Sequence, residues 1–213
     1  MARIGVFGGT GYAGGHLVAE AARRGHQVTS WSRSTPEQPV DGVRYEQGSL
    51  LDPGTRSSAL AAADVVVVAV APRGDMAGEV RGGIAALAAE AERAGVRLGV
   101  VGGTGSLRVS EDGPLVFDTP DFPAEYRPES VEMAGALAEL RATGTLDWFY
   151  VSPPAGFGAY APGEARGTYR VGGEVLLTDD DGGSFISGAD FARALVDEIE
   201  QPAHRQAHFT VAY

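Results

Sequence analysis

The chain has 213 residues, 44% of them hydrophobic and 21% charged, which is the composition of an ordinary globular protein with a full apolar core. Its net charge of -11 argues against proteins that bind nucleic acid or anionic membranes through a basic surface. The absence of cysteine excludes disulfides and thiolate catalysis. There is also no lysine, because all 17 basic residues are arginine, so any mechanism that needs a catalytic lysine is excluded.

Apolar strand-like runs alternate with alanine-rich helical stretches, which predicts an α/β fold: a Rossmann-type, doubly wound parallel sheet with crossover helices. The predicted strands of this sheet are Arg3–Phe7, Gln27–Trp31, Val43–Glu46, Val65–Val70, Arg97–Val101 and Asp147–Val151. The predicted helices are Gly14–Gly25, Thr55–Ala63, Glu79–Ala94 and Ser130–Thr143. The longest apolar run has only the length of a strand, so we expect no membrane span. A secretory signal has an apolar stretch near the N-terminus, and this chain has a glycine-rich turn at that place. We therefore expect no secretory signal.

The pattern changes after Val151, where prolines and glycines predict a loop. A hairpin of Thr168–Val171 with Glu174–Leu177, a helix over Ala189–Gln201 and a strand over Ala207–Ala212 are expected to follow it. Ser187 and Asp190 have the spacing of a capping box for that helix. No linker interrupts the chain. We therefore expect one domain over residues 1–213, with about 153–213 forming a small substrate-side lobe.

The first predicted strand runs into a glycine-rich turn with glycines at its first, fourth and seventh positions. Such glycines allow a tight turn, a close approach of backbone N–H groups to a pyrophosphate, and a helix that starts next to the sheet. The strand before the turn and the helix after it favour a dinucleotide site over a turn without a ligand. The residues that we expect to bind the cofactor here are Gly8, Thr10, Gly11, Tyr12, Ala13 and Gly14.

The second predicted strand is followed by Ser32, Arg33 and Ser34, where an NAD-binding fold usually carries an acidic residue. An arginine flanked by hydroxyls suits the 2'-phosphate of NADP(H), so NAD(H) is the less favoured cofactor. A solvated surface arginine is the alternative interpretation of Arg33.

The segment Gly5–Gly11 has a near-repeat at Gly99–Gly105, again at the end of a predicted strand. Both loops should open at the carboxyl edge of the sheet, where open α/β sheets bind their ligands. Only the first copy continues to a third glycine and a long helix, so we expect the second to face the reactive end of the ligand.

These residues resemble the atypical short-chain dehydrogenase/reductases, in particular the NAD(P)H-binding, NmrA-like proteins named as NADH-flavin reductases. They are similar, less closely, to the biliverdin reductase B (flavin reductase) proteins. Besides the glycine turn, the resemblance is carried by Gly48–Asp52, Val101–Leu107, Asp118–Pro123, Val151–Ala155, Gly167–Arg170 and Arg205–Tyr213. It therefore covers nearly the whole chain.

The resemblance implies how the cofactor would lie along this edge. Adenine contacts are implied at Gly48, Ser49 and Leu50, with Ser49 replacing the aspartate that the family usually has. Ribose contacts are implied at Ala69, Val70 and Ala71. Around the nicotinamide, the implied residues are Gly103, Thr104, Ser106, Ser152, Pro153 and Ala155.

The proton donor of ordinary short-chain dehydrogenases, a tyrosine four residues before a lysine, is missing here, because Tyr126 is followed at that spacing by Ser130. Hydride transfer to a flavin does not need such a proton donor, since positioning of the reactants and exclusion of water can suffice. We assign the catalytic positions to Thr104 and Ser106, whose hydroxyls could bind the nicotinamide amide or the acceptor. Their alternative role is to cap the loop after the strand.

The function that we expect is an NADP(H)-dependent oxidoreductase that transfers hydride to a flavin (FMN or FAD as substrate) or a similar flat conjugated acceptor. Phe157 and Tyr160 would stack on that acceptor, or else only pack the lobe. A non-catalytic NADP-binding redox sensor of NmrA type and a tailoring or epimerase-type enzyme are the alternatives. We expect a cytoplasmic monomer or homodimer with a small-molecule substrate, and no metal, nucleic acid or membrane partner.

Overall fold

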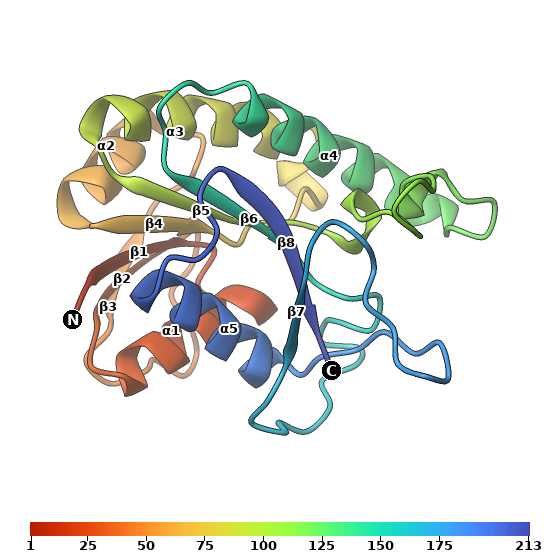
Figure 1. Cartoon of the computed structure of the whole chain (residues 1–213). Helices are drawn as coiled ribbons and strands as arrows, with labels where there is room; N and C mark the ends of the chain where they lie inside the picture. Colours follow the sequence, from red (N-terminus) through yellow and green to blue (C-terminus); the bar gives the residue numbers. More distant parts are fainter.

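Eight strands form one sheet in the order β3-β2-β1-β4-β5-β6-β8-β7, in a computed structural model that describes residues 1–213 (Figure 1). All neighbouring strands are parallel except β7, which pairs antiparallel with β8. The strands are β1 Arg3–Phe7, β2 Gln27–Ser32, β3 Arg44–Gln47, β4 Val65–Val68, β5 Arg97–Val101, β6 Trp148–Ser152, β7 Arg170–Gly172 and β8 Ala207–Ala212. The predicted doubly wound α/β fold is therefore confirmed.

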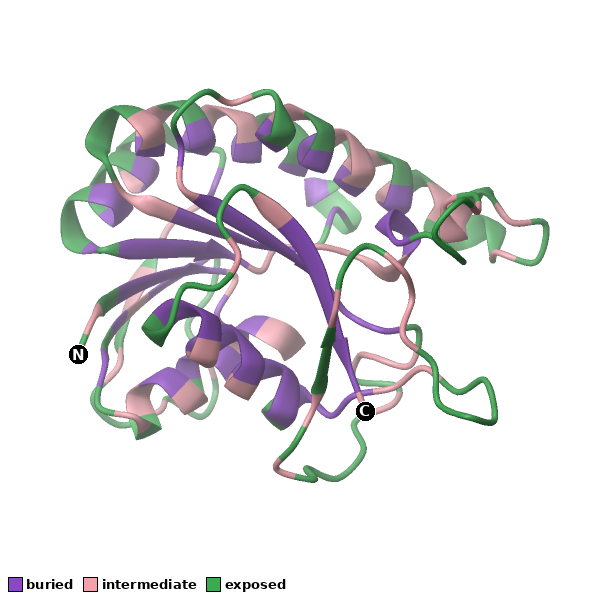
Figure 2. Ribbon diagram, in the orientation of Figure 1, coloured by how far each residue is buried: buried purple, intermediate pink, exposed green.

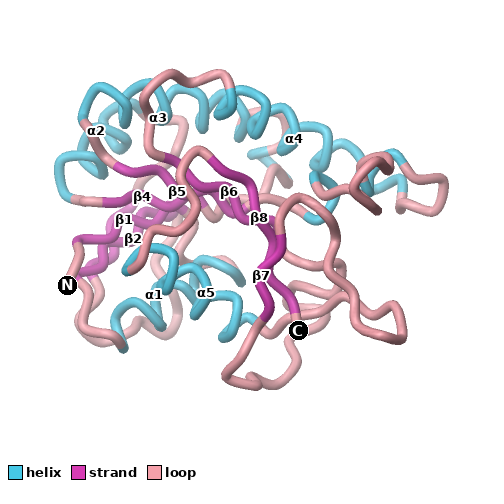
Figure 3. The backbone as a smooth tube through the Cα atoms, in the orientation of Figure 1, coloured by secondary structure: helices cyan, strands magenta, loops and turns pink.

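Helices cover both faces of the sheet, with α2, α3 and α4 on one face and α1 and α5 on the other (Figure 3). The helices are α1 Tyr12–Arg23, α2 Pro53–Ala62, α3 Val80–Ala94, α4 Arg127–Arg141 and α5 Gly188–Glu200. Short 3-10 turns are η1 Gly74–Met76, η2 Thr104–Ser106, η3 Val116–Asp118 and η4 Ala124–Tyr126. The strand and helix boundaries lie within a few residues of those predicted.

The core has two layers, which follow from a sheet that is covered on both faces (Figure 2). β4 is buried along its whole length, with Val66 and Val68 facing α2, α3 and α4, and with Val65 and Val67 facing α1 and α5. A continuous run of β-branched residues is what a central parallel strand between two helical layers requires.

The predicted hairpin after β6 is wrong. β7 pairs with β8, whereas the backbone of Glu174 and Leu176 bonds to Arg108 (2.8 and 2.9 Å). β8 is a buried strand, and its edge away from β6 is free to pair with β7. Tertiary pairing therefore replaces the local turn.

The segment that we predicted as a lobe is partly built into the main layers. β8 lies beside β6, and α5 packs against α1. The expected cap of α5 is confirmed, because the Ser187 hydroxyl accepts a hydrogen bond from the Asp190 amide (3.1 Å). The reciprocal bond of a capping box is absent: the Ser187 amide donates to the Tyr213 hydroxyl instead (3.3 Å). What lies outside the layers is the looped chain before and after β7, between β6 and α5 (Figure 1).

Candidate functional site

The turn after β1 has a backbone that only glycine can form. Gly8 has φ +86° and donates its amide to the Trp31 carbonyl (2.9 Å), and a Cβ on it would lie 2.6 Å from the Ala69 oxygen. A Cβ on Gly14 would lie 2.2 Å from the Gly8 oxygen. The first and third glycines are thus required so that strand, turn and helix can approach each other.

The middle glycine has a different environment, because Gly11 is exposed and a Cβ on it would meet only the Gly8 oxygen, at 3.3 Å. Gly11 is the N-cap of α1 and provides no side chain to cap it. The amides of Tyr12 and Ala13 in the first turn have no backbone acceptor. A helix start with free amides, no acidic residue and an open approach fits an anionic pyrophosphate.

At the carboxyl end of β2, Ser32 is buried and its hydroxyl has no hydrogen-bond partner in the protein. A buried hydroxyl without a partner is uncommon, and at this edge it fits a polar ligand such as a ribose or its phosphate. Arg33 and Ser34 beside it are exposed. With the glycine turn, these residues fit the adenosine half of a dinucleotide.

Arg33 already has a partner, which the sequence did not reveal. Its guanidinium donates to Asp75 in η1 (2.6 Å), and both side chains are mainly exposed. This pair spans the edge from the loop after β2 to the loop after β4. A ligand phosphate would meet Arg33 together with a competing carboxylate.

The residues implied to hold adenine and ribose lie next to this pair. The Gly48 amide donates to the Ser32 carbonyl (3.0 Å), which places residues 48–50 beside β2. The Ser49 hydroxyl accepts from the Leu51 amide (3.1 Å), and the Leu50 side chain is buried in the core. Leu50 can therefore offer a ligand only its backbone. Of the ribose set, Ala69 and Val70 are half-buried and Ala71 is exposed.

The second glycine loop follows β5 and lies against the loop after β6. Thr104 donates its hydroxyl to the carbonyls of Pro153 and Pro154 (both 2.9 Å), so it holds the two loops together. Ser106 is buried, and its hydroxyl lies 3.4 Å from that of Tyr150. Both hydroxyls thus have internal partners, as loop-capping residues would. The catalytic assignment to Thr104 and Ser106 stays a prediction.

Ser152 completes the link between these loops, because its hydroxyl donates to the Gly103 carbonyl (3.0 Å) and lies 2.9 Å from His208 Nε2. Ser152 and Pro153 are buried, while Ala155 is exposed. A Cβ on Gly103 would meet nothing within 4 Å. The surface that these loops offer a nicotinamide therefore consists of the exposed Ala155, the half-buried Gly103 and Thr104, and their backbone.

The buried tyrosine of this region, Tyr150, is not prepared to act as an acid. Burial raises the pKa of Tyr150 to about 12, so its phenol keeps its proton and donates to the Met133 carbonyl (3.2 Å). Tyr126, at the start of α4, is 44% exposed and lies under the Arg73 guanidinium, 5.7 Å from the ring centre.

Tyr12 connects the glycine turn to the loops beyond β6. Its hydroxyl accepts from the Gly188 amide (3.1 Å) and donates to the Pro162 carbonyl (3.4 Å), and its ring packs edge-on against Phe157 (5.3 Å). The structure therefore gives Tyr12 a positioning role and packs Phe157 against Phe191 (4.4 Å).

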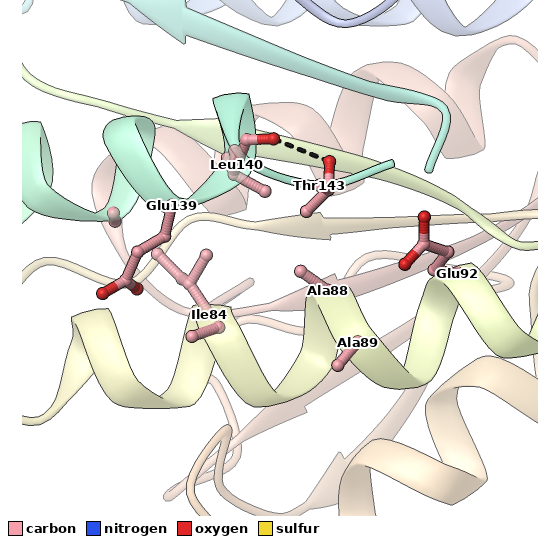
Figure 4. A pocket seen from close by; sticks show the side chains of 9 residues that line it. Ile84, Ala88, Ala89, Glu92, Glu139, Leu140 and Thr143 are labelled. Carbon is pink, nitrogen blue, oxygen red and sulfur yellow. Dashed lines mark hydrogen bonds between the residues drawn. The ribbon is translucent and has the colours of Figure 1, made fainter. Parts of the chain in front are cut away.

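A small cavity lies away from this edge, between α3 and α4, with a volume of about 120 Å³ (Figure 4). Its wall is mostly apolar, and Thr143 bonds to the Leu140 carbonyl (2.6 Å). Glu92 is engaged with the amide and hydroxyl of Thr145. Ligand pockets usually measure about 300–1,000 Å³, so this cavity is a packing gap. No group of three or more histidine and acidic side chains is placed to hold a metal ion.

Together, the central β1, the glycine turn into α1 and the loops at one sheet edge define a dinucleotide-binding protein of the Rossmann class. The chain belongs to the NAD(P)H-binding family, whose match spans residues 8–202. The resemblance found in the sequence is thereby confirmed. None of the helices combines the length and apolar character needed to cross a bilayer.

Three relatives are similar over nearly their whole length. The uncharacterized protein YwnB of Bacillus subtilis is 34% identical over 211 residues, 98% of this chain and 97% of YwnB. The crystal structure of a "putative exported protein" from Burkholderia pseudomallei is 39% identical, with a TM-score of 0.88 and full coverage of both chains. That of a "putative NADH-flavin reductase" from Streptococcus pneumoniae is 31% identical, with a TM-score of 0.85, covering 100% of this chain and 99% of the other.

Proposed function

We propose that the protein is an NADP(H)-dependent reductase that delivers hydride to a flavin or a similar flat conjugated acceptor. The observation that carries this proposal is the chemistry of the loops after β5 and β6. They offer backbone, glycine and alanine, the hydroxyls of Thr104 and Ser106 have internal partners, and the pKa of Tyr150 is raised. Such a surface can position reactants but provides no activated acid.

The preference for NADP(H) rests on the end of β2. Arg33, the unpartnered Ser32 hydroxyl and Ser34 suit a phosphate, and no acidic residue follows the strand to accept a ribose hydroxyl. The name of the Streptococcus pneumoniae relative supports a flavin as the acceptor.

In this mechanism the glycine turn and the start of α1 bind the pyrophosphate, and Arg33 binds the 2'-phosphate. The loops after β5 and β6, joined through Thr104, hold the nicotinamide ring against the acceptor. The reduced cofactor, when bound, would supply the hydride, and the flavin would take it up together with a proton from water in a two-electron reduction. The protein would contribute by orienting the cofactor and the acceptor and by shielding them from water.

The deciding experiment is a turnover screen of NADPH and NADH against flavins, quinones and enones. We expect steady oxidation of NADPH with free flavin and weaker use of NADH. Tight NADP binding without turnover on any acceptor would favour the redox sensor instead. Conversion of a sugar or other metabolite without net oxidation of the cofactor would favour the epimerase-type enzyme.

We also propose a cytoplasmic location, a monomer or homodimer, and a small molecule as the only partner besides the cofactor. The high negative charge supports the absence of a nucleic acid partner. Cell fractionation and light scattering test the first two proposals.

A further inference from the structure

His208 in β8 is a buried histidine that contacts the end of β6. Its Nε2 lies 2.9 Å from the Ser152 hydroxyl, and its ring packs edge-on against Tyr150, with 5.1 Å between the ring centres. The His208 side chain has no exposed surface. The imidazole can therefore act on the candidate site only through its protein neighbours.

The Ser152 hydroxyl has two close neighbours and only one proton to donate. It lies 3.0 Å from the Gly103 carbonyl, which can only accept, and 2.9 Å from His208 Nε2. Both contacts are hydrogen bonds only if the hydroxyl donates to Gly103 and an Nε2–H of His208 donates to the hydroxyl. With a bare Nε2, one of the two contacts would bring two acceptors together without a proton between them.

The other ring nitrogen of His208 leads to the same assignment. Nδ1 has no hydrogen-bond partner, and the Glu174 carboxylate oxygen on its side is 4.0 Å away. The other oxygen of Glu174 pairs with Arg141 on α4 (2.5 Å). A proton on Nδ1 would be a buried donor without an acceptor, which folded proteins rarely contain. Because burial lowers the pKa of His208 to about 4, the ring carries one proton at neutral pH, and that proton is on Nε2.

The bond from Ser152 fixes the carbonyl of Gly103 in the loop after β5. This carbonyl accepts from the Ser106 amide (3.1 Å) as well as from the Ser152 hydroxyl, so both of its lone pairs are used. The Gly103 amide, by contrast, has no acceptor in the protein. A Cβ on Gly103 would meet nothing within 4 Å, so the approach to this residue is open. The loop thus offers a ligand one free amide, next to a carbonyl that is held in place.

We propose that His208 is a positioning residue whose Nε2–H directs the Ser152 hydroxyl to Gly103. This bond holds the free Gly103 amide in place for the carboxamide oxygen of the nicotinamide. His208 itself touches neither cofactor nor acceptor. The inference rests on the proposed function, because it concerns how the cofactor of that reaction is held.

NMR of the imidazole nitrogens in the folded protein at neutral pH tests the tautomer, because it distinguishes a nitrogen that carries a proton from a bare one. The His208 signals are identified by their loss in His208→Gln. We expect the proton on Nε2 and a bare Nδ1. A proton on Nδ1 would turn the Ser152 hydroxyl toward the imidazole and would overturn the inference.

Calorimetric titration with NADP tests the positioning role. Ser152→Ala should weaken binding by about threefold to tenfold, the size of one neutral hydrogen bond. His208→Leu should weaken it by about twofold to threefold, because the Ser152 hydroxyl is then free to choose among its staggered positions. His208→Gln should recover most of this loss, since its side-chain amide can donate to Ser152.

The double variant separates this role from a loss of packing. Once Ser152 is replaced by alanine, His208→Leu should weaken NADP binding no further, because both changes break the same chain of hydrogen bonds. Val211→Ala is the matched control, since Val211 is also fully buried in β8 but packs in the layer of α1 and α5. It should lower the urea midpoint and leave NADP affinity unchanged.

Full additivity of the Ser152 and His208 changes would overturn the positioning role. A loss of affinity in Val211→Ala as large as in Ser152→Ala would also overturn it, because general damage to β8 would then explain the effect. These measurements need no turnover. If NADP binding shows the expected pattern and no acceptor is reduced, the reductase proposal fails while the inference about His208 is supported.

Discussion

Arg33 and Asp75 form the pair on which cofactor choice depends. Arg33→Ala should weaken NADP(H) binding by about tenfold, equal to about 1.4 kcal/mol, near the lower end for charged contacts because the side chain is exposed. Binding of NAD(H), which lacks the phosphate, should hardly change. Titration of both cofactors by calorimetry measures the difference.

Asp75→Asn is the complementary variant. It removes the competing carboxylate and leaves Arg33 in place, so NADP(H) should bind more tightly and NAD(H) as before. An equal loss for both cofactors in Arg33→Ala, or a native preference for NAD(H), would refute the assignment of the 2'-phosphate site.

The three glycines of the turn should respond differently to substitution. Gly11→Val places a side chain into the open approach to the pyrophosphate, so we expect cofactor binding to vanish while the circular dichroism spectrum stays native. Gly14→Ala should destabilise the fold, because its Cβ would lie 2.2 Å from the Gly8 oxygen. Native NADP affinity in a folded Gly11→Val variant would contradict the placement.

At the scale of elements, the loops after β5 and β6 are one hydrogen-bonded unit. Thr104→Val removes both bonds to the proline carbonyls, so it should loosen the unit and slow hydride transfer. The loss should stay below the roughly 10²–10⁴-fold typical of removing a general acid. Single-turnover NADPH oxidation at saturating acceptor isolates this step.

Tyr126→Phe provides the contrast in the same assay. If no tyrosine acts as the acid, the rate should stay within about tenfold of the wild type, a barrier change of ~1.4 kcal/mol. Loss of turnover with intact cofactor binding would instead indicate a carbonyl or enone substrate with Tyr126 as its proton donor.

The start of α5 depends on a buried carboxylate. Burial raises the pKa of Asp190, but hydrogen bonds from Tyr213 and the amides of Arg166 and Gly167 outweigh it, so the pKa lies below its ordinary value of 3.8. The unfolded chain then binds the proton first as pH falls. The stability that ionised Asp190 gives to the folded state is complete well above pH 3.8. It is lost as the pH falls through the lower pKa that Asp190 has in the folded protein.

Asp190→Asn should therefore cost about 1–3 kcal/mol of unfolding free energy at pH 7, because it weakens several buried hydrogen bonds. Urea unfolding measures this cost. The variant should also lose less stability than the wild type when the pH is lowered below 4, and equal acid sensitivity of both would count against the role of Asp190.

The elements were predictable where the pattern is local. The strand–turn–helix of Gly8–Gly14 and the buried valines of β4 follow from spacing and periodicity, and the Ser187 cap follows from its place before an apolar helix. The pairing of β7 was not predictable, because its partners in β8 lie 38 to 42 residues away in sequence. The burial of Leu50 and the Arg33–Asp75 ion pair likewise depend on tertiary contacts, which no local sequence pattern indicates.

For the whole molecule, the buried His208 in β8 should make stability depend on pH between pH 6.5 and about pH 4. Burial lowers the pKa of His208 from 6.5 to about 4, whereas Glu174 has a smaller opposing effect and Arg141 a small effect in the same direction. Its ring packs edge-on against Tyr150 (5.1 Å), lies beside Ser152, and has an Nδ1 without a hydrogen-bond partner. The site therefore holds a neutral imidazole that joins β8, β6 and the loop after β5.

Between pH 6.5 and pH 4 the unfolded chain binds a proton at this residue and the folded chain does not, so the folded state loses stability as pH falls through this range. The loss should approach a value on the order of 3 kcal/mol below pH 4. His208→Gln keeps a donor for Ser152 and removes the titration, so its stability curve should be flatter than that of the wild type in this range. Urea unfolding of both proteins at closely spaced pH values measures the difference. A wild-type histidine signal for His208 that titrates near pH 6.5 in the folded protein, or parallel stability curves, would show that this imidazole does not control the acid response.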